Sequence, residues 1–138
     1  MTDYVMPLKM SNYTKREKNN FGTQETSSPN YKVKGTEEFD KRIKRLVKRY
    51  PSLAREIVGL ITELETNPTK GISLGNSCCK IRLAIASKRQ GKSGGARVIT
   101  HTVVVDKTVF LLTVYDKSEQ ETISEQRIQA LVDVAESE

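Results

Sequence analysis

The sequence predicts a single α+β domain in which a helical hairpin packs on a small twisted antiparallel sheet. Two apolar stripes at helical spacing come first, three segments of strand character follow, and a third helical stripe ends the chain. The chain has 138 residues, which is enough for one such domain. The predicted order of elements is strand, helix, helix, strand, strand, strand, helix.

Residues 1–30 differ from the rest of the chain. They are polar, rich in Asn, Ser and Thr, and show no hydrophobic period. We expect this segment to be disordered or an extension outside the core, with the folded domain spanning residues 31–138.

The domain is expected to begin with a short strand at "YKVKG", followed by a helix. Thr36 is a suitable N-cap, and Glu37 and Glu38 follow in the first turn, where the helix dipole favours acids. One face of this helix is apolar (Phe39, Ile43, Leu46, Val47, Tyr50) and the other is basic (Lys41, Arg42, Lys44, Arg45, Lys48, Arg49).

Pro51 interrupts this helix, and a second apolar stripe follows within the next turn. It consists of Leu53, Ile57, Leu60, Ile61 and Leu64. The stretch "NPTKG" then stops the helix. Two stripes of similar length joined at "YPS" predict a helical hairpin.

In "CKIRLAIAS" apolar residues recur at every second position. This pattern predicts a half-buried strand with Lys80 and Arg82 on its open face. The stretches "ARVITHTVVV" and "TVFLLTVY" predict two further strands, with a tight turn at residues 106–107. A last helix is expected to start at Ser118 or Ser124 and to carry an acidic outer face. Its apolar stripe consists of Ile128, Leu131, Val132 and Ala135.

Charge is unevenly distributed along the chain. The net charge is +6, but residues 118–138 hold one cation and six acids, so the remainder carries +11. The stretch 78–97 contains six cations and no acid. Such a cluster favours a polyanion partner, most commonly nucleic acid, although lysines that merely keep the protein soluble are the alternative.

The stretch "GKSGGARVI" at residues 91–99 invites comparison with a nucleotide-binding loop. A P-loop needs an earlier glycine and a following helix, whereas position 86 is alanine and a strand follows. We therefore expect a hairpin turn in which Gly94 and Gly95 supply the backbone freedom. The cations that flank this turn are Lys88, Arg89, Lys92 and Arg97.

Several classes of protein are disfavoured by the composition. Cys78 and Cys79 are adjacent, so a disulfide between them would be strained, and they do not have the spacing of metal ligands. We therefore expect reduced thiols, with a regulatory or intermolecular disulfide as the alternative. No apolar run is long enough for a membrane span, and the first residues lack a signal-peptide pattern. We expect a cytoplasmic protein without a metal, a cofactor or a membrane partner.

Three stretches together resemble one known family. Lys80 and Arg82 form a K-x-R strand, residues 94–99 read G-G-A-R-V-I, and residues 111–119 read L-L-T-V-Y-D-K-S-E. This joint pattern is similar to the bacterial RelE/ParE toxin superfamily, and within it to HigB-like RelE toxins of type II toxin–antitoxin modules. The resemblance covers roughly residues 31–130 and implies the same fold as the periodicity does.

The resemblance implies an mRNA endonuclease (an mRNA interferase) that acts on the ribosome without a metal. The ribose 2′-OH would attack the adjacent phosphate, and protein groups would move protons and stabilise the developing charge. With one histidine in the chain, this work would fall on Arg, Lys and Tyr.

Residue by residue, the family pattern makes Arg97 the expected stabiliser of phosphate charge, because guanidinium binds phosphate in a bidentate manner. Arg82, Tyr115 and Lys117 are the other expected catalytic residues. Tyr115 is a general base only if nearby cations lower its pKa, and otherwise stacks on a base or packs in the sheet. The expected RNA-binding residues are Lys80, Lys88, Arg89 and Lys92.

His101 shares strand parity with Arg97, so both side chains are expected on one face. We interpret it as a half-exposed strand histidine and do not count it as catalytic.

Two other functions stay open. A ParE-type inhibitor of DNA gyrase has the same fold, and a toxin-fold protein without activity would only bind RNA or a partner. The resemblance implies a cognate antitoxin, typically a small helix-turn-helix DNA-binding protein, with ribosome and mRNA as targets. Operator DNA would be contacted only through the antitoxin.

Overall fold

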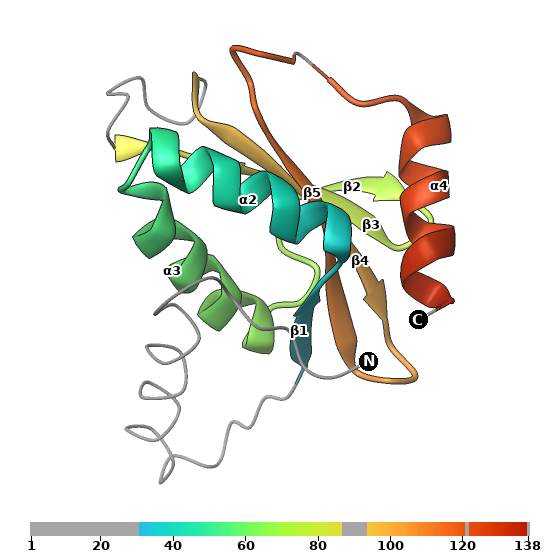
Figure 1. Ribbon diagram of the computed structural model, residues 1–138. Coiled ribbons are helices and arrows are strands. Elements are labelled where there is room, and N and C mark those ends of the chain that lie inside the picture. The colour runs from blue at the N-terminus through green and yellow to red at the C-terminus, as the bar shows by residue number, and fades with distance from the viewer. Residues whose placement is uncertain (1–30, 87–93, 121, 138) are drawn as a thin grey trace, which may run out of the picture.

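The computed structural model describes residues 31–86, 94–120 and 122–137 (Figure 1). The residues described form five strands and three helices. In chain order they are β1 (Lys32–Gly35), α2 (Glu37–Arg49), α3 (Leu53–Thr66), β2 (Ile72–Gly75), β3 (Cys78–Leu83), β4 (Ala96–Val103), β5 (Thr108–Asp116) and α4 (Glu125–Glu136).

The strands form one sheet in the order β1-β5-β4-β3-β2. Strands β2 to β5 are an antiparallel meander, as the sequence predicts for the last three of them. Two details differ from the prediction: β1 joins the edge of β5 in parallel, and β2 is an additional strand. The predicted α+β class with a helical hairpin on a small sheet is confirmed.

Helix α2 begins where its capping residue predicts. The Thr36 hydroxyl accepts a hydrogen bond from the backbone N–H of Phe39 at 3.2 Å. The same hydroxyl lies 3.1 and 3.0 Å from the carbonyl oxygens of Leu111 and Leu112 in β5. The N-cap therefore also attaches the start of α2 to the sheet.

Helices α2 and α3 cover one face of the sheet and build the main core. The helices contribute large apolar side chains from the face that each turns toward the sheet. The strands contribute the side chains that project from this face of the sheet. The buried members from the sheet and its flanks are Ile81, Ile85, Ala96, Val98, Val109, Leu111 and Val114, which meet Phe39, Ile43, Leu46, Leu53, Ile57, Val58, Leu60, Ile61 and Leu64.

Helix α4 covers part of the opposite face, apart from α2 and α3 in Figure 1. Ser124 is its N-cap and accepts from the N–H of Arg127, which decides between the two predicted starts. Its predicted stripe packs on the sheet in a second cluster of Cys78, Ile99, Leu112, Tyr115, Leu131, Val132 and Ala135. None of the helices described is long and apolar enough to cross a membrane.

Strand β2 carries no sequence signal that predicts it. All four of its residues are exposed, so the strand has no buried face that would produce an alternating apolar pattern in the sequence. It pairs with β3 because the chain reverses through Asn76 and Ser77, both with positive φ angles of 53° and 60°. Such a pairing is set by the turn and the neighbouring strand rather than by the four residues themselves.

Gly95 has a packing role where β4 begins. A β-carbon at this position would lie 2.1 Å from the carbonyl oxygen of Leu83 in β3. Only glycine allows the two backbones to come this close. The rest of the predicted hairpin turn, residues 87–93, lies outside the described residues.

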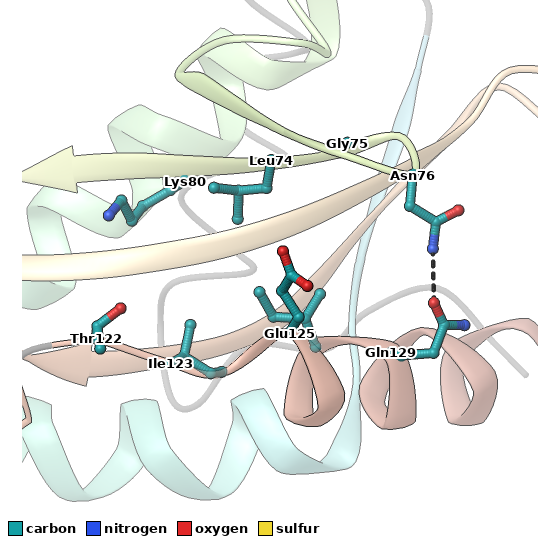
Figure 2. A pocket seen from close by; sticks show the side chains of 9 residues that line it. Leu74, Gly75, Asn76, Lys80, Thr122, Ile123, Glu125 and Gln129 are labelled. Atoms are coloured by element: carbon teal, nitrogen blue, oxygen red, sulfur yellow. Dashed lines mark hydrogen bonds between the residues drawn. The ribbon is translucent and has the colours of Figure 1, made fainter.

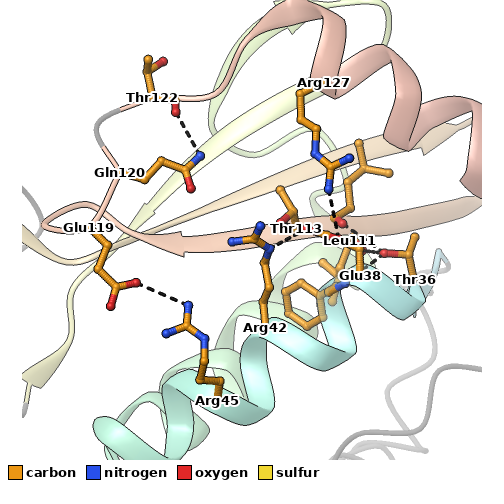
Figure 3. A network of polar contacts seen from close by, with 12 residues as sticks. Thr36, Glu38, Arg42, Arg45, Leu111, Thr113, Glu119, Gln120, Thr122 and Arg127 are labelled. Carbon is orange, nitrogen blue, oxygen red and sulfur yellow. Dashed lines mark hydrogen bonds and ion pairs between the residues drawn. The ribbon is translucent and has the colours of Figure 1, made fainter.

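An ion-pair cluster around Glu38 links α2, β5 and α4 (Figure 3). Its carboxylate accepts from Arg42 one turn further along α2 and from the hydroxyl of Thr113 at 3.3 Å. Arg127 of α4 reaches the second oxygen at 3.1 Å. Burial alone would raise the pKa of Glu38, but hydrogen bonding and charge from Arg42 and then Arg127 hold it below its usual value.

We expect Glu38→Gln to lower the free energy of unfolding by about 1 kcal/mol at neutral pH. Because the pKa of Glu38 is lower in the folded chain, its contribution is complete above the unfolded pKa and is lost as pH falls through the folded pKa. The difference between the two proteins should therefore shrink below about pH 4. Urea denaturation across pH measures it, with the exposed neighbour Glu37→Gln as the control. A difference that persists at low pH would contradict an ionic origin.

Candidate functional site

Three of the predicted catalytic residues lie in one row across the sheet. Arg82 in β3 is directly opposite Arg97 in β4, and Arg97 is directly opposite Tyr115 in β5. Residues paired in this way project from the same face of an antiparallel sheet. This is the face away from α2 and α3, since the neighbouring row of Ile81, Val98 and Val114 lies in the main core.

The members of this row differ in exposure. Arg82 is exposed, as expected for the open face of β3. Arg97 is only 4% exposed, which differs from the expectation of a cation on an open surface. Its Nη1 donates to the carbonyl oxygen of Ala96 at 3.2 Å. A phosphate from solution would reach Arg97 only after a change in the groups that cover it.

Tyr115 is 2% exposed and belongs to the cluster beneath α4. Its hydroxyl has no hydrogen-bond partner among the residues described. Burial raises the pKa of Tyr115, and the nearby charge of Arg97 opposes this only in part. A general base would need the opposite shift of its pKa, so in this conformation Tyr115 is suited to act as a neutral phenol rather than as a base.

Two predicted lysines flank the row. Lys80 lies on the same face of β3 as Arg82, two residues along, and is half-buried. Lys117 follows β5 directly, and its backbone N–H donates to the carbonyl oxygen of Gly95 at 3.0 Å. The other three predicted RNA-binding residues, Lys88, Arg89 and Lys92, lie outside the described residues.

Asp116 is a residue that the sequence analysis did not single out. It is fully buried at the end of β5 and accepts from the Tyr50 hydroxyl at 3.0 Å. It also accepts from the N–H and the hydroxyl of Ser118 at 2.9 and 2.8 Å. These contacts hold the backbone on both sides of Lys117. The signal in the sequence is the D-K-S spacing, which is typical of an Asx turn.

The sequence model for the RelE toxin of the RelE/RelB toxin–antitoxin system matches residues 39–137. The chain belongs to the RelE toxin family. A free-state structure of a mutant of the E. coli toxin RelE is similar at 15% sequence identity and a TM-score of 0.48, over 68% of this chain and 90% of that chain. No curated protein is significantly similar in sequence.

The predicted membership is thus confirmed at the level of the RelE toxin family, and the HigB-like subtype stays a prediction. A RelE-family chain has a cognate antitoxin as its implied partner. No group of three or more His, Cys, Asp or Glu residues in the described part of this toxin is arranged to hold a metal ion.

His101 is buried in this RelE-family toxin, at 3% exposure, which corrects the expectation of a half-exposed side chain. Its Nδ1 lies 3.6 Å from the Cys78 sulfur, and its Nε2 lies 2.8 Å from a carboxylate oxygen of Glu136 in α4. As strand parity predicts, His101 lies on the same face of the sheet as Arg97. Its side chain is buried because α4 packs on this face. The contact with Glu136 comes from the far end of the chain, which strand parity cannot reveal.

Both cysteines are free and buried. Burial raises the pKa of Cys78 to about 11, with smaller contributions from Cys79 and Glu136, and burial likewise raises the pKa of Cys79.

We therefore expect neither thiol to react with a disulfide reagent at pH 8 in the native chain, because a pKa near 11 leaves only about 0.1% of Cys78 as thiolate. Both should react once the chain is unfolded in urea. Counting the released chromophore under the two conditions measures this. A thiol that reacts at once in the native chain would show that its cover opens readily.

A second prediction concerns the unpartnered hydroxyl. We expect Tyr115→Phe to leave the free energy of unfolding unchanged or to raise it by up to about 1 kcal/mol, because it removes a buried donor that is desolvated without compensation. Tyr50→Phe is the matched control and should cost about 1–2 kcal/mol, since it breaks a bond to the Asp116 carboxylate. Urea denaturation compares the two. A loss with Tyr115→Phe as large as that of the control would show that the hydroxyl has a partner.

Proposed function

We propose that this RelE-family toxin inhibits translation by cutting mRNA on the ribosome, without a metal ion, through attack of the ribose 2′-OH on the adjacent phosphate. The observation that carries the proposal is the row of Arg82, Arg97 and Tyr115 across three adjacent strands. Family membership supports the toxin role, and the row supplies residues of the kind that phosphoryl chemistry needs.

Each member of the row is proposed to have one role. Arg97 stabilises the charge that develops on the phosphate, because its fork of donors matches two phosphate oxygens. Arg82 is exposed beside it and holds the incoming RNA strand. Tyr115 is neutral and donates a hydrogen bond to the reacting phosphate or to the leaving oxygen.

Arg97 and Tyr115 are buried, so the proposed reaction requires a change in the groups that cover them. Both side chains have to become accessible when RNA binds, so the free chain is not in its fully assembled catalytic state. Catalytic contacts are often loose or incomplete in an enzyme without its substrate. Lys80 and Lys117 flank the row and add positive charge on the path of the RNA backbone.

The proposed partners follow from the same reasoning. The ribosome and mRNA are the targets, which requires a cytoplasmic location. The cognate antitoxin, proposed to be a small helix-turn-helix protein, would hold the toxin inactive. Contact with operator DNA would be made through the antitoxin rather than by this chain.

We expect Arg97→Lys and Arg82→Ala to reduce mRNA cleavage on purified ribosomes by about 10–1,000-fold, because each removes charge or bidentate contact at the phosphate. Arg97→Lys keeps the positive charge and so tests the guanidinium fork. Tyr115→Phe, which should fold at least as well as the wild type, is expected to fall in the same range. Primer extension on a defined mRNA measures the cut.

The exposed arginine of α3 provides the control, since Arg55→Ala removes one charge far from the row. A message with a 2′-deoxynucleotide before the scissile phosphate should resist cleavage. Full cleavage by the Arg97 and Arg82 variants would refute the site. Inhibition of gyrase supercoiling without any cleavage would replace the proposed function by that of a gyrase inhibitor.

A further inference from the structure

A pocket lies beside the candidate site, between the turn that joins β2 to β3 and the start of α4 (Figure 2). Its volume is about 340 Å³. The residues that line it are Leu74, Gly75, Asn76, Lys80, Thr122, Ile123, Glu125, Ile128 and Gln129.

The walls of this pocket combine apolar and polar groups. Leu74 from β2, Ile123 from the segment before α4 and Ile128 from α4 itself line the pocket and together offer apolar contact. At the turn, the Asn76 side chain donates to the Gln129 side chain at 3.0 Å, and this bond joins the two sides. Apolar side chains with a few polar groups between them are typical of a site that binds a small molecule.

Two side chains of opposite charge line the pocket. Among the lining residues that the structure describes, Lys80 is the one cation and Glu125 is the one acid. Figure 2 shows the Glu125 carboxylate extending from the first turn of α4 toward the strands. A ligand with a phosphate at one end and amino groups at the other would satisfy both charges.

The pocket adjoins the row of Arg82, Arg97 and Tyr115. Lys80 lies two residues from Arg82 on the same face of β3, which is about 7 Å along the strand. A single nucleotide of extended RNA spans such a distance. Ile123 and Ile128, which line the pocket, also pack against the cluster that contains Tyr115.

We propose that this pocket receives the base of a nucleotide next to the scissile phosphate, with Lys80 on its phosphate and Glu125 on the edge of the base. The inference rests on the proposed function. The carboxylate of Glu125 accepts hydrogen bonds from the amino groups of adenine, cytosine or guanine. Uracil places two carbonyl oxygens around its single N–H, and these repel a carboxylate. The pocket therefore disfavours uracil at one position of the message.

The test is a cleavage assay on ribosomes programmed with messages in which the nucleotides around the cut are randomised. Sequencing of the cut ends gives the relative cleavage for each base at each position within one reaction, so the ratio does not depend on the total rate. We expect the full-length wild-type chain to disfavour uracil at one position beside the cut. Glu125→Gln should reduce this discrimination by about tenfold, because an amide can also donate to a uracil oxygen.

Glu37→Gln is the matched control, since Glu37 is the first residue of α2 as Glu125 is of α4, and it lies outside the pocket. It should leave the base profile unchanged. A message with 6-thioguanosine at the discriminated position, which keeps the N1–H and the 2-amino group of guanine, adds a direct readout, and irradiation should join it to the peptide that contains Ile123 or to the peptide that contains Leu74.

The outcomes separate this inference from its premise. If the wild type cuts mRNA but Glu125→Gln has the same base profile, the pocket is not a base site and the proposed function stands. A uniform change at all positions, or an effect on antitoxin binding alone, also overturns the inference. If the wild type does not cut mRNA, the proposed function fails and the base site fails with it.

Discussion

The register that pairs β4 with β3 on one side and with β5 on the other determines where the candidate functional side chains lie. Because side chains alternate between the two faces of a sheet, this register places Ile81, Val98 and Val114 in the core beneath α2 and α3. The same register places the row of Arg82, Arg97 and Tyr115 on the opposite face. A shift of one residue in either pairing would separate that row and expose the core, so packing and site are specified together.

Helix α4 adds a second constraint, because it packs on the face that carries the row. It is attached at both ends: Arg127 near its start pairs with Glu38 of α2, and Glu136 in its last turn pairs with His101 of β4. Between these contacts its apolar stripe covers the cluster that includes Tyr115. Within the row, Arg82 is exposed whereas Arg97 and Tyr115 are buried, and the segment before α4 forms a wall of the adjoining pocket.

Much of the fold was predictable because its signals are local. The helices followed from apolar spacing, and the caps Thr36 and Ser124 followed from residue types that accept from the first turn. Strand β2 and the parallel pairing of β1 with β5 were not predictable, because both depend on a neighbour rather than on their own four residues. In the candidate site, strand parity indicated Lys80 and Arg82 on the open face of their strand and His101 on the same face as Arg97, but the role of Asp116 and the partners of His101 depend on residues far away in the chain.

The sequence by itself determined the α+β class, the cation-rich stretch from residue 78 to 97 and the resemblance to RelE toxins, because hydrophobic period, charge and short motifs are properties of neighbouring residues. The tertiary structure alone decided that Arg97 and Tyr115 are buried, that the pKa of Tyr115 is raised, and that a pocket adjoins Lys80. The physical reason is that desolvation depends on which distant segments cover a side chain. In this toxin the last helix is the segment that packs over the cluster containing Tyr115.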